Sequence, residues 1–129
     1  MRVFVDTNIF VASLTDEPGR GETATALLDR DDEFLTSVLN LMELRTVLTK
    51  KKRIEQERVE STLDDIADNV TICAPEISDQ TAAYEKQKET LLYPLDCVLL
   101  ALATDLDAEF VTFDSELLDH GAVSPEDIL

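Results

Sequence analysis

Short apolar runs alternate along this chain with longer segments in which apolar residues recur every three or four positions. The short runs predict β-strands, and the longer segments predict helices that bury one face. Two of the predicted strands stop directly at an aspartate. Strands are predicted over residues 3–5, 34–36, 70–73 and 109–113. Helices are predicted over residues 8–14, 22–30, 38–52, 57–68, from Ser78 or Asp79 to 91, over 96–105, and briefly after residue 114.

Strands that alternate with helices predict an α/β domain over residues 1–129, with a central parallel sheet covered by helices on both faces. The helix at 96–105 is apolar on nearly every side and should be central. Asp6 interrupts the N-terminal apolar stretch, and the longest apolar run, Cys97–Ala103, is too short to cross a bilayer. We therefore expect no signal peptide, no membrane contact and a cytoplasmic location.

The formal net charge is −17, from 28 acidic and 11 basic residues. In dilute buffer such a chain repels both itself and nucleic acid. In a cytosol of molar salt the Debye length falls to about 3 Å, so this repulsion is screened. The composition therefore indicates a halophilic protein and does not exclude a nucleic-acid substrate. The alternative is an ordinary acidic domain with a basic partner.

Asp6 and Asp114 each follow a predicted buried strand. In open α/β sheets the functional crevice lies outside the carboxyl ends of the strands, so these two side chains should lie close together. The simpler interpretation is that each aspartate caps the helix that follows it. That interpretation is reasonable for one such residue and weaker for two.

Two further acids lie on predicted helices. Glu43 is four residues from both Leu39 and Val47, which places it on an apolar line where an ionised carboxylate needs a partner or a cation. Alternatively, it lies at the margin of that line and reaches solvent. Asp96 opens the central helix, where it is either a helix cap or part of the same sheet edge.

Four carboxylates that meet without a basic residue need a cation to stay ionised together. All-oxygen ligands select Mg²⁺ or Mn²⁺, and the chemistry that uses such ions without a protein nucleophile is chiefly phosphoryl transfer to water. Zinc is not expected, because His120 is the only histidine and the cysteines are not paired at ligand spacing. Cys73 and Cys97 are expected to be buried free thiols.

These residues together resemble the PIN-domain nucleases, and more narrowly the toxin of a VapBC-type toxin–antitoxin pair. The resemblance rests on MRVFVDTNIF, on Glu43 within SVLNLMELRTVLTKK, and on Asp96 and Asp114 within PLDCVLLALATDLDAEFVTFD. It implies a three-layer α/β/α PIN-like fold, an RNA substrate, an antitoxin partner and a homodimer. It also implies that one or two Mg²⁺ or Mn²⁺ ions are held for RNA cleavage by Asp6, Glu43, Asp96 and Asp114.

The resemblance further implies supporting roles for Thr7 or Asn8 beside the first acid, and for Thr112. Thr112 precedes Asp114 by two residues and would share its face of the strand, although it also suits a strand as a plain β-branched residue. The family often has another acid after the last aspartate, followed by an aromatic residue. Here that stretch is Ser115–Leu118, so Glu116 is the candidate.

Five of the 11 basic residues fall in one short stretch of the third predicted helix: Arg45, Lys50, Lys51, Lys52 and Arg53. They either complement the dipole at the end of that helix or contact RNA phosphates or a partner. The resemblance also allows a PIN-domain RNA-processing nuclease without an antitoxin. Competing functions of other classes are an aspartyl phosphatase, a phospho-accepting receiver domain and a non-catalytic acidic interaction module. The first normally needs a second aspartate at position 8, where this chain has asparagine.

Overall fold

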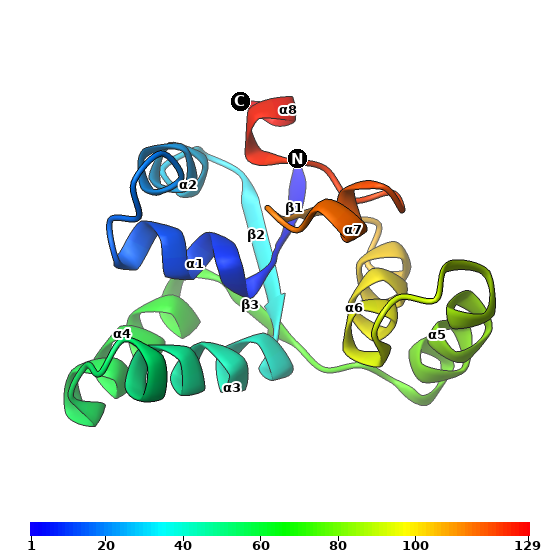
Figure 1. Cartoon of the computed structure of the whole chain (residues 1–129), viewed down its shortest axis with the longest axis horizontal. Helices are drawn as coiled ribbons and strands as arrows, with labels where there is room; N and C mark the ends of the chain where they lie inside the picture. Colours follow the sequence, from blue (N-terminus) through cyan, green and yellow to red (C-terminus); the bar gives the residue numbers. More distant parts are fainter.

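The computed structural model describes all 129 residues. One sheet of four parallel strands is flanked by helices (Figure 1). The strands are β1 (Arg2–Val5), β2 (Glu33–Ser37), β3 (Thr71–Cys73) and β4 (Glu109–Val111). The helices are α1 (Thr7–Leu14), α2 (Gly21–Leu28), α3 (Val38–Thr46) with a π-helical turn η1 (Val47–Lys51), α4 (Gln56–Asn69), α5 (Ile77–Thr90), α6 (Pro94–Asp105), α7 (Ser115–Leu118) and α8 (Pro125–Ile128).

The strand order β3-β2-β1-β4 places the first and last strands side by side. Phe4 of β1 is in register with Leu35 of β2 on one side and with Phe110 of β4 on the other. The chain builds outward from β1 to β3 and then crosses back to add β4. The junction of β1 and β4 is therefore a topological switch point, where α/β sheets form their functional crevice.

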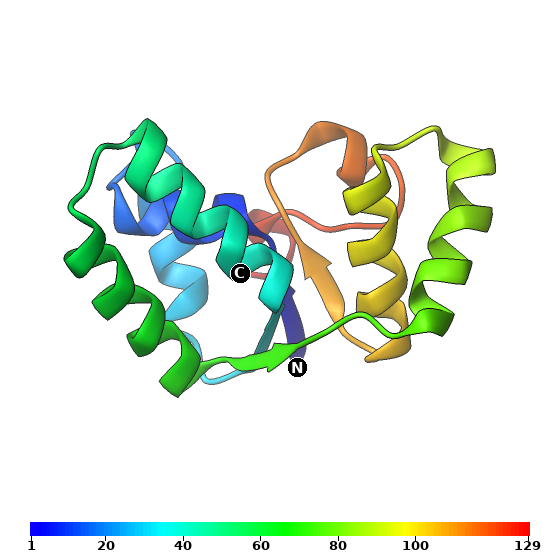
Figure 2. The same ribbon diagram turned by 90° about the horizontal axis from the view of Figure 1, so that it is seen from below.

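Alternate side chains of β1 enter two separate cores, which gives the molecule three layers (Figure 2). Val3 and Val5 pack with helices α1 to α4 on one face of the sheet, whereas Phe4 packs with α5, α6 and α7 on the other. The predicted α/β/α architecture with a parallel sheet is confirmed. None of the helices has both the length and the apolar composition needed to cross a membrane.

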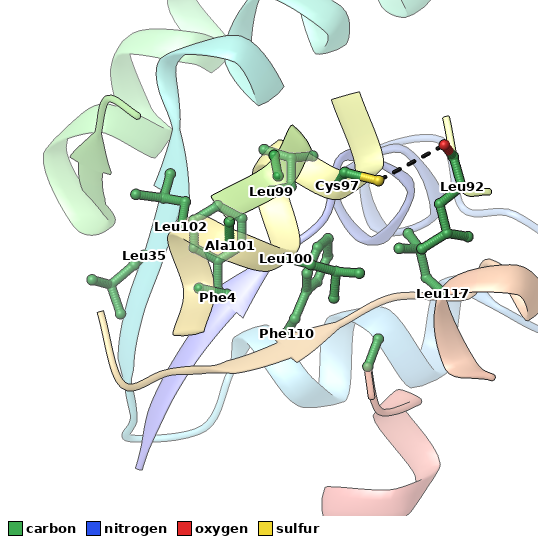
Figure 3. Packing of buried hydrophobic residues seen from close by; sticks show 13 residues of the cluster. Phe4, Leu35, Leu92, Cys97, Leu99, Leu100, Ala101, Leu102, Phe110 and Leu117 are labelled. Atoms are coloured by element: carbon green, nitrogen blue, oxygen red, sulfur yellow. Dashed lines mark hydrogen bonds between the residues drawn. The ribbon is translucent and has the colours of Figure 1, made fainter. Parts of the chain in front are cut away.

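Helix α6 is central to its layer, as its apolar sequence predicted (Figure 3). Leu99 and Leu102 are each 2% exposed, and the Phe4 and Phe110 rings meet edge to face with their centroids 5.4 Å apart. The Cys97 thiol is buried there, 3.7 Å from the Leu92 carbonyl oxygen. Both cysteines are free, although Cys73 is only partly buried.

Three predicted element boundaries are wrong for identifiable reasons. Helix α5 begins at Ile77 with Glu76 as its N-cap, because the buried carboxylate of Asp79 accepts a hydrogen bond from the Glu76 amide at 2.8 Å. Helix α6 begins at Pro94, since proline is well suited to the first helical position. Strand β4 ends at Val111, two residues earlier than predicted.

Candidate active site

The carboxyl ends of β1 and β4 present Asp6 and Asp114 to one cavity. Each aspartate also caps the next helix. Oδ1 of Asp6 accepts a hydrogen bond from the Thr7 amide at 2.8 Å, and Oδ1 of Asp114 accepts one from the Glu116 amide at 2.9 Å. The capping interpretation is therefore correct for both residues, and it does not compete with a place at the cavity.

A network of short polar side chains fixes the second oxygen of Asp6. The Thr112 hydroxyl donates to Oδ2 of Asp6 at 2.7 Å and accepts from the Asn8 amide nitrogen at 3.0 Å. Asn8 in turn accepts a hydrogen bond from the Phe113 amide at 3.2 Å, and the Asp114 amide donates to the Thr112 hydroxyl at 3.0 Å. Thr112 lies just beyond β4 and joins the two strand ends.

Asn40 is part of this network, although nothing in the sequence argument selected it. Its side-chain nitrogen donates to the Thr7 hydroxyl at 3.0 Å and lies 3.4 Å from Oδ1 of Asp6. Its side-chain oxygen completes a capping box with Ser37 at the start of α3. Two features of the sequence could have indicated Asn40: its Ser-x-x-Asn spacing from Ser37, and its position four residues before Leu44 on the buried side of α3.

Glu43 lines the cavity, but its side chain is exposed, so the prediction that it is buried is wrong. Leu39 and Val47, the apolar residues four positions away on either side, are themselves only half-buried. The buried line of this helix runs one position further along, through Asn40, Leu44 and Leu48. Glu43 thus lies at the margin of the core, where that margin borders the cavity.

Asp96 reaches the same cavity from the first turn of α6. It is the third helical residue, and Tyr93 occupies the N-cap position, so the alternative that Asp96 caps the helix is wrong. Its carboxylate is half-buried beside Leu95 and Leu99. The central helix therefore aims an acid toward the ends of β1 and β4.

The cavity has a volume of about 280 Å³, and five carboxylates line it with no lysine, arginine or histidine among them. The full lining consists of Asp6, Thr7, Asn8, Val11, Glu17, Glu43, Val47, Leu95, Asp96, Leu99 and Asp114. A concave site with convergent acids at a topological switch point is a strong candidate for an active site.

Burial, and after it the neighbouring acids, raise the pKa values of two cavity carboxyls. Burial is the largest cause for Asp6, whose pKa rises from 3.8 to about 6; Glu43 and Asp96 raise it further, while the hydrogen bonds from Thr112 and Thr7 lower it. Burial likewise raises the pKa of Asp96, followed by the charges of Asp114, Glu43 and Glu116. Near neutral pH these carboxylates repel one another, and a positive charge among them would relieve this repulsion.

Glu17 is the fifth carboxylate, and the sequence argument assigned it to a polar connection only. The loop that carries it is tightly built: its amide donates to the Ala12 carbonyl at 3.0 Å, and Gly21 has backbone atoms of Ala12 and Asp16 3.0 Å from the position of a Cβ. Arg20 lies 3.6 Å from the Glu17 carboxylate and places its guanidinium 5.0 Å from the centre of the Phe113 ring.

The remaining predicted residues lie outside the cavity. Glu116 is exposed and contributes through its charge on Asp96. Arg45 pairs with Glu60 through two contacts of 2.7 and 2.8 Å. Four more predicted contact residues, at the end of the same helix, do not line the cavity: Lys50, Lys51, Lys52 and Arg53.

The donor set of the cavity fits a hard divalent cation by its chemistry, because every charged ligand is a carboxylate oxygen. The raised pKa values point the same way, since a cation would offset the mutual repulsion. No three acidic, histidine or cysteine side chains converge on one point in the present arrangement. The roles of the individual acids as ligands therefore remain predictions.

Comparison with known proteins assigns the fold. Residues 3–122 match the model of the PIN domain. This chain belongs to the PIN-domain family. None of the curated proteins compared with it matches. Among solved structures, the PIN domain is similar to VapC20 of Mycobacterium tuberculosis, described as a sarcin–ricin loop cleaving toxin, with a TM-score of 0.78, 21% identity, and 94% of this chain and 96% of that one covered.

Two further neighbours of this PIN domain come from toxin–antitoxin systems. A toxin–antitoxin complex from Klebsiella pneumoniae is 21% identical with a TM-score of 0.75, covering 95% of this chain and 97% of that one. VapBC2 from Rickettsia felis, bound to a promoter DNA fragment, is 21% identical with a TM-score of 0.72, covering 96% and 97%. At this identity the likeness establishes the shared fold.

Proposed function

We propose that this protein is a Mg²⁺- or Mn²⁺-dependent endoribonuclease and the toxin of a toxin–antitoxin pair in the cytoplasm. The observation that carries the proposal is the cavity at the β1–β4 switch point, lined by five carboxylates and no basic side chain. Membership of the PIN-domain family and the fold shared with VapC toxins support it.

Apart from its carboxylates, the cavity contains no side chain suited to act as a nucleophile on phosphorus. Its single hydroxyl belongs to Thr7, which hydrogen-bonds both the carbonyl oxygen and the side chain of Asn40. There is no cysteine, histidine or lysine. Asn8 occupies the position where an aspartyl phosphatase needs its second acid, and its amide is held by Thr112 and Phe113. Water is therefore the expected nucleophile.

The protein groups in this proposal position charge. Asp6 is held by Thr112 and Thr7, so its carboxylate has a fixed direction, while Asp96 and Glu43 face it from α6 and α3. When bound, a divalent ion supplies an activated water and neutralises charge at the scissile phosphate. Asp6, Glu43, Asp96 and Asp114 would hold it, with Glu17 at the margin.

The direct test is cleavage of RNA by the purified protein in Mg²⁺ or Mn²⁺, compared with excess EDTA and with Asp96→Asn. We expect cleavage only with metal, and loss of at least about a hundredfold in rate for the variant. Far-UV circular dichroism should show that the variant remains folded. Cleavage that continues undiminished in EDTA would exclude the metal mechanism. A folded protein without any metal-dependent activity would favour the acidic interaction module instead.

We further propose an antitoxin partner that covers the acidic cavity. Structural neighbours from Klebsiella pneumoniae and Rickettsia felis are described as toxin–antitoxin assemblies. A segment that blocks this cavity must bring positive charge to five carboxylates, since a neutral segment would leave them repelling one another. Co-expression with the products of adjoining genes should yield a complex that cleaves RNA more slowly than the free protein. A chain that purifies alone and is inhibited by none of them would contradict this.

The proposed homodimer is supported by an exposed apolar stripe on α5. Ile77, Tyr84 and Leu91 are 84%, 68% and 85% exposed and follow at intervals of seven residues. Ile77 and Tyr84 belong to α5 and Leu91 is its C-cap, and none of the three is among the residues that α5 buries, which are Asp79 and Ala83. Light scattering should give a dimer mass for the protein and a monomer mass for Tyr84→Glu. A monomeric unmodified protein would refute this assignment.

We also propose that the protein works in a high-salt cytoplasm. Its 28 acidic residues greatly outnumber the six ion pairs of the structure, so most carboxylates face solvent without a cationic partner. Salt near 1 M shortens the Debye length to about 3 Å and screens this repulsion. The melting temperature of the protein should therefore rise as the KCl concentration is increased from low salt to about 1 M. A melting temperature unchanged down to low salt would refute the proposal.

A further inference from the structure

Basic side chains without an ion-pair partner gather at one end of the α3–η1 helix. Of the 11 basic residues, only six take part in no ion pair, and five of these six lie here. Arg58 of α4 belongs to the group because it lines the same small cavity as Leu48 and Ile54. We call this group the basic tip; it consists of Lys50, Lys51, Lys52, Arg53 and Arg58.

The helix end that carries the basic tip has an unusual backbone. The last turn is π-helical, with the Lys52 amide bonded to the Val47 carbonyl at 3.0 Å. Arg53 then adopts a left-handed conformation with φ of 55°, a position that glycine usually occupies at helix ends. π turns and left-handed non-glycine residues cost stability and occur often at functional sites. The four consecutive cations therefore lie on a turn whose backbone conformation lowers the stability of the folded protein.

The helix dipole does not explain the whole basic tip. A cation near a helix C-terminus is stabilised by the helix dipole, and this accounts for lysines in the last turn. Arg58, however, is the third residue of α4, close to a helix N-terminus, where a positive charge is unfavourable. A ligand of negative charge would explain both positions.

The basic tip continues a line of side chains that begins in the acidic cavity. Glu43 and Val47 line the cavity, and Lys51 follows four residues later, so the three share one side of the helix. At about 1.5 Å per residue, Lys50 to Arg53 lie roughly 10–15 Å from Glu43 along the axis. Figure 2 shows this helix running from the centre of the molecule to its outer edge, away from α5 and α6.

We infer that the basic tip binds the phosphate backbone of the RNA strand whose scissile phosphate enters the acidic cavity. The inference rests on the proposed ribonuclease function. With a rise of about 3.4 Å per nucleotide along the axis of a stacked strand, the separation corresponds to about three or four nucleotides. No aromatic side chain belongs to the tip, so it contacts phosphates without stacking on bases. The strand therefore follows the α3–η1 helix from the cavity to the molecular edge.

The test compares two double variants that each remove two positive charges. Lys50→Gln/Lys51→Gln alters the basic tip, and the control, Arg2→Gln/Lys86→Gln, alters one side chain at the start of β1 and one on α5 that is outside the proposed dimer stripe. Both are made in the Asp96→Asn background, to prevent cleavage, and binding of a fluorescent oligouridylate of about 20 nucleotides is followed by anisotropy with Mg²⁺. Circular dichroism confirms folding at each salt concentration.

We expect the tip variant to lower the slope of log K against log salt by about 1.4, since each lost phosphate contact on a single strand accounts for about 0.7. The control variant should leave the slope unchanged. For a dinucleotide, the tip variant should bind as well as the parent, because this strand is too short to reach from the cavity to Lys50.

Equal effects of the two double variants would overturn the inference and assign the change to net charge alone. An unchanged salt slope for the tip variant would also overturn it. Polyglutamate is measured in the same way as a model of an acidic protein. If the tip variant loses polyglutamate binding while its RNA binding is unchanged, the inference is overturned and the tip is assigned to an acidic protein partner. These outcomes are separate from a failure of the proposed function, which would appear as absence of metal-dependent cleavage by the unmodified protein while binding remains measurable.

Discussion

Replacing Asp6 by asparagine should stabilise the metal-free protein while abolishing its activity. Asp6 is 8% exposed, and its pKa of about 6 in the folded state compares with 3.8 for an unperturbed aspartate. Since one pKa unit corresponds to about 1.4 kcal/mol, keeping this carboxylate ionised in the folded protein costs about 3 kcal/mol. Because the folded-state pKa is raised, the penalty is absent below about pH 4, grows as the pH rises, and is complete above about pH 6.

The asparagine variant does not recover the whole of this energy. The Thr7 amide donates to one oxygen of Asp6 and the Thr112 hydroxyl to the other, and an asparagine has only one oxygen, so one of these bonds loses its acceptor. Allowing about 1–2 kcal/mol for that loss leaves a net gain of about 1–2 kcal/mol at pH 7.5. For a domain of this size we expect a melting temperature about 4–8 °C higher in EDTA. Below about pH 4 the variant should be no more stable than the original protein.

The assay is thermal unfolding followed by circular dichroism at pH 7.5 and below pH 4, with EDTA and then with Mg²⁺. Added Mg²⁺ should stabilise the original protein and not Asp6→Asn, because binding to the folded state alone raises stability. Asp119→Asn is the matched control, since Asp119 is exposed and lies outside the cavity. A variant that melts below the original protein at pH 7.5 in EDTA would show that its hydrogen bonds outweigh the electrostatic penalty.

Other variants test the same site. Thr112→Val removes the hydroxyl that lowers the Asp6 pKa, so the acidic limb of the pH–rate profile should move up by about one unit; an unmoved limb would contradict this. Glu17→Gln should weaken Mg²⁺ binding about tenfold in calorimetry, less than Asp6→Asn does, because Arg20 already neutralises part of its charge. Gly21→Ala should destabilise by about 1–2 kcal/mol in urea unfolding, since its Cβ meets backbone atoms at 3.0 Å; unchanged stability would mean that the loop yields.

Strong periodic patterns made most of the fold predictable. Val3 to Val5 and Phe110 to Val111 are buried on both faces of a parallel sheet, and such strands read as continuous apolar runs that end where the chain reaches the sheet edge. The aspartates after these runs could therefore be placed at one edge from sequence. The start of α5 was missed because a run of several polar residues offers more than one N-cap. The start of α6 was missed because Pro94 was placed before the helix, whereas it is the first helical residue.

The parts of the site that sequence did not predict depend on contacts between distant segments. Glu17 lies in a short polar loop without periodicity, and only the close packing of Gly21 against Ala12 brings it to the cavity. Asn40 has an ordinary capping spacing, yet its contact with Thr7 spans 33 positions. Glu43 was expected to be buried because it aligns with the apolar residues Leu39 and Val47, but these two are only half-buried and Glu43 is exposed.

An acidic protein that cuts an acidic polymer needs positive charge in two places, and the two needs differ in kind. At the cavity, a lysine or arginine among the ligands would neutralise carboxylates permanently and leave no room for an ion, so the charge there must be exchangeable. Along the strand the charge must be fixed, because it positions phosphates that do not react. The five carboxylates of the cavity and the five cations of the basic tip meet these two needs separately, and the α3–η1 helix connects the two places. High salt weakens only the fixed contacts by screening, so it should raise KM through the tip while leaving the buried chemistry at Asp6 largely unscreened.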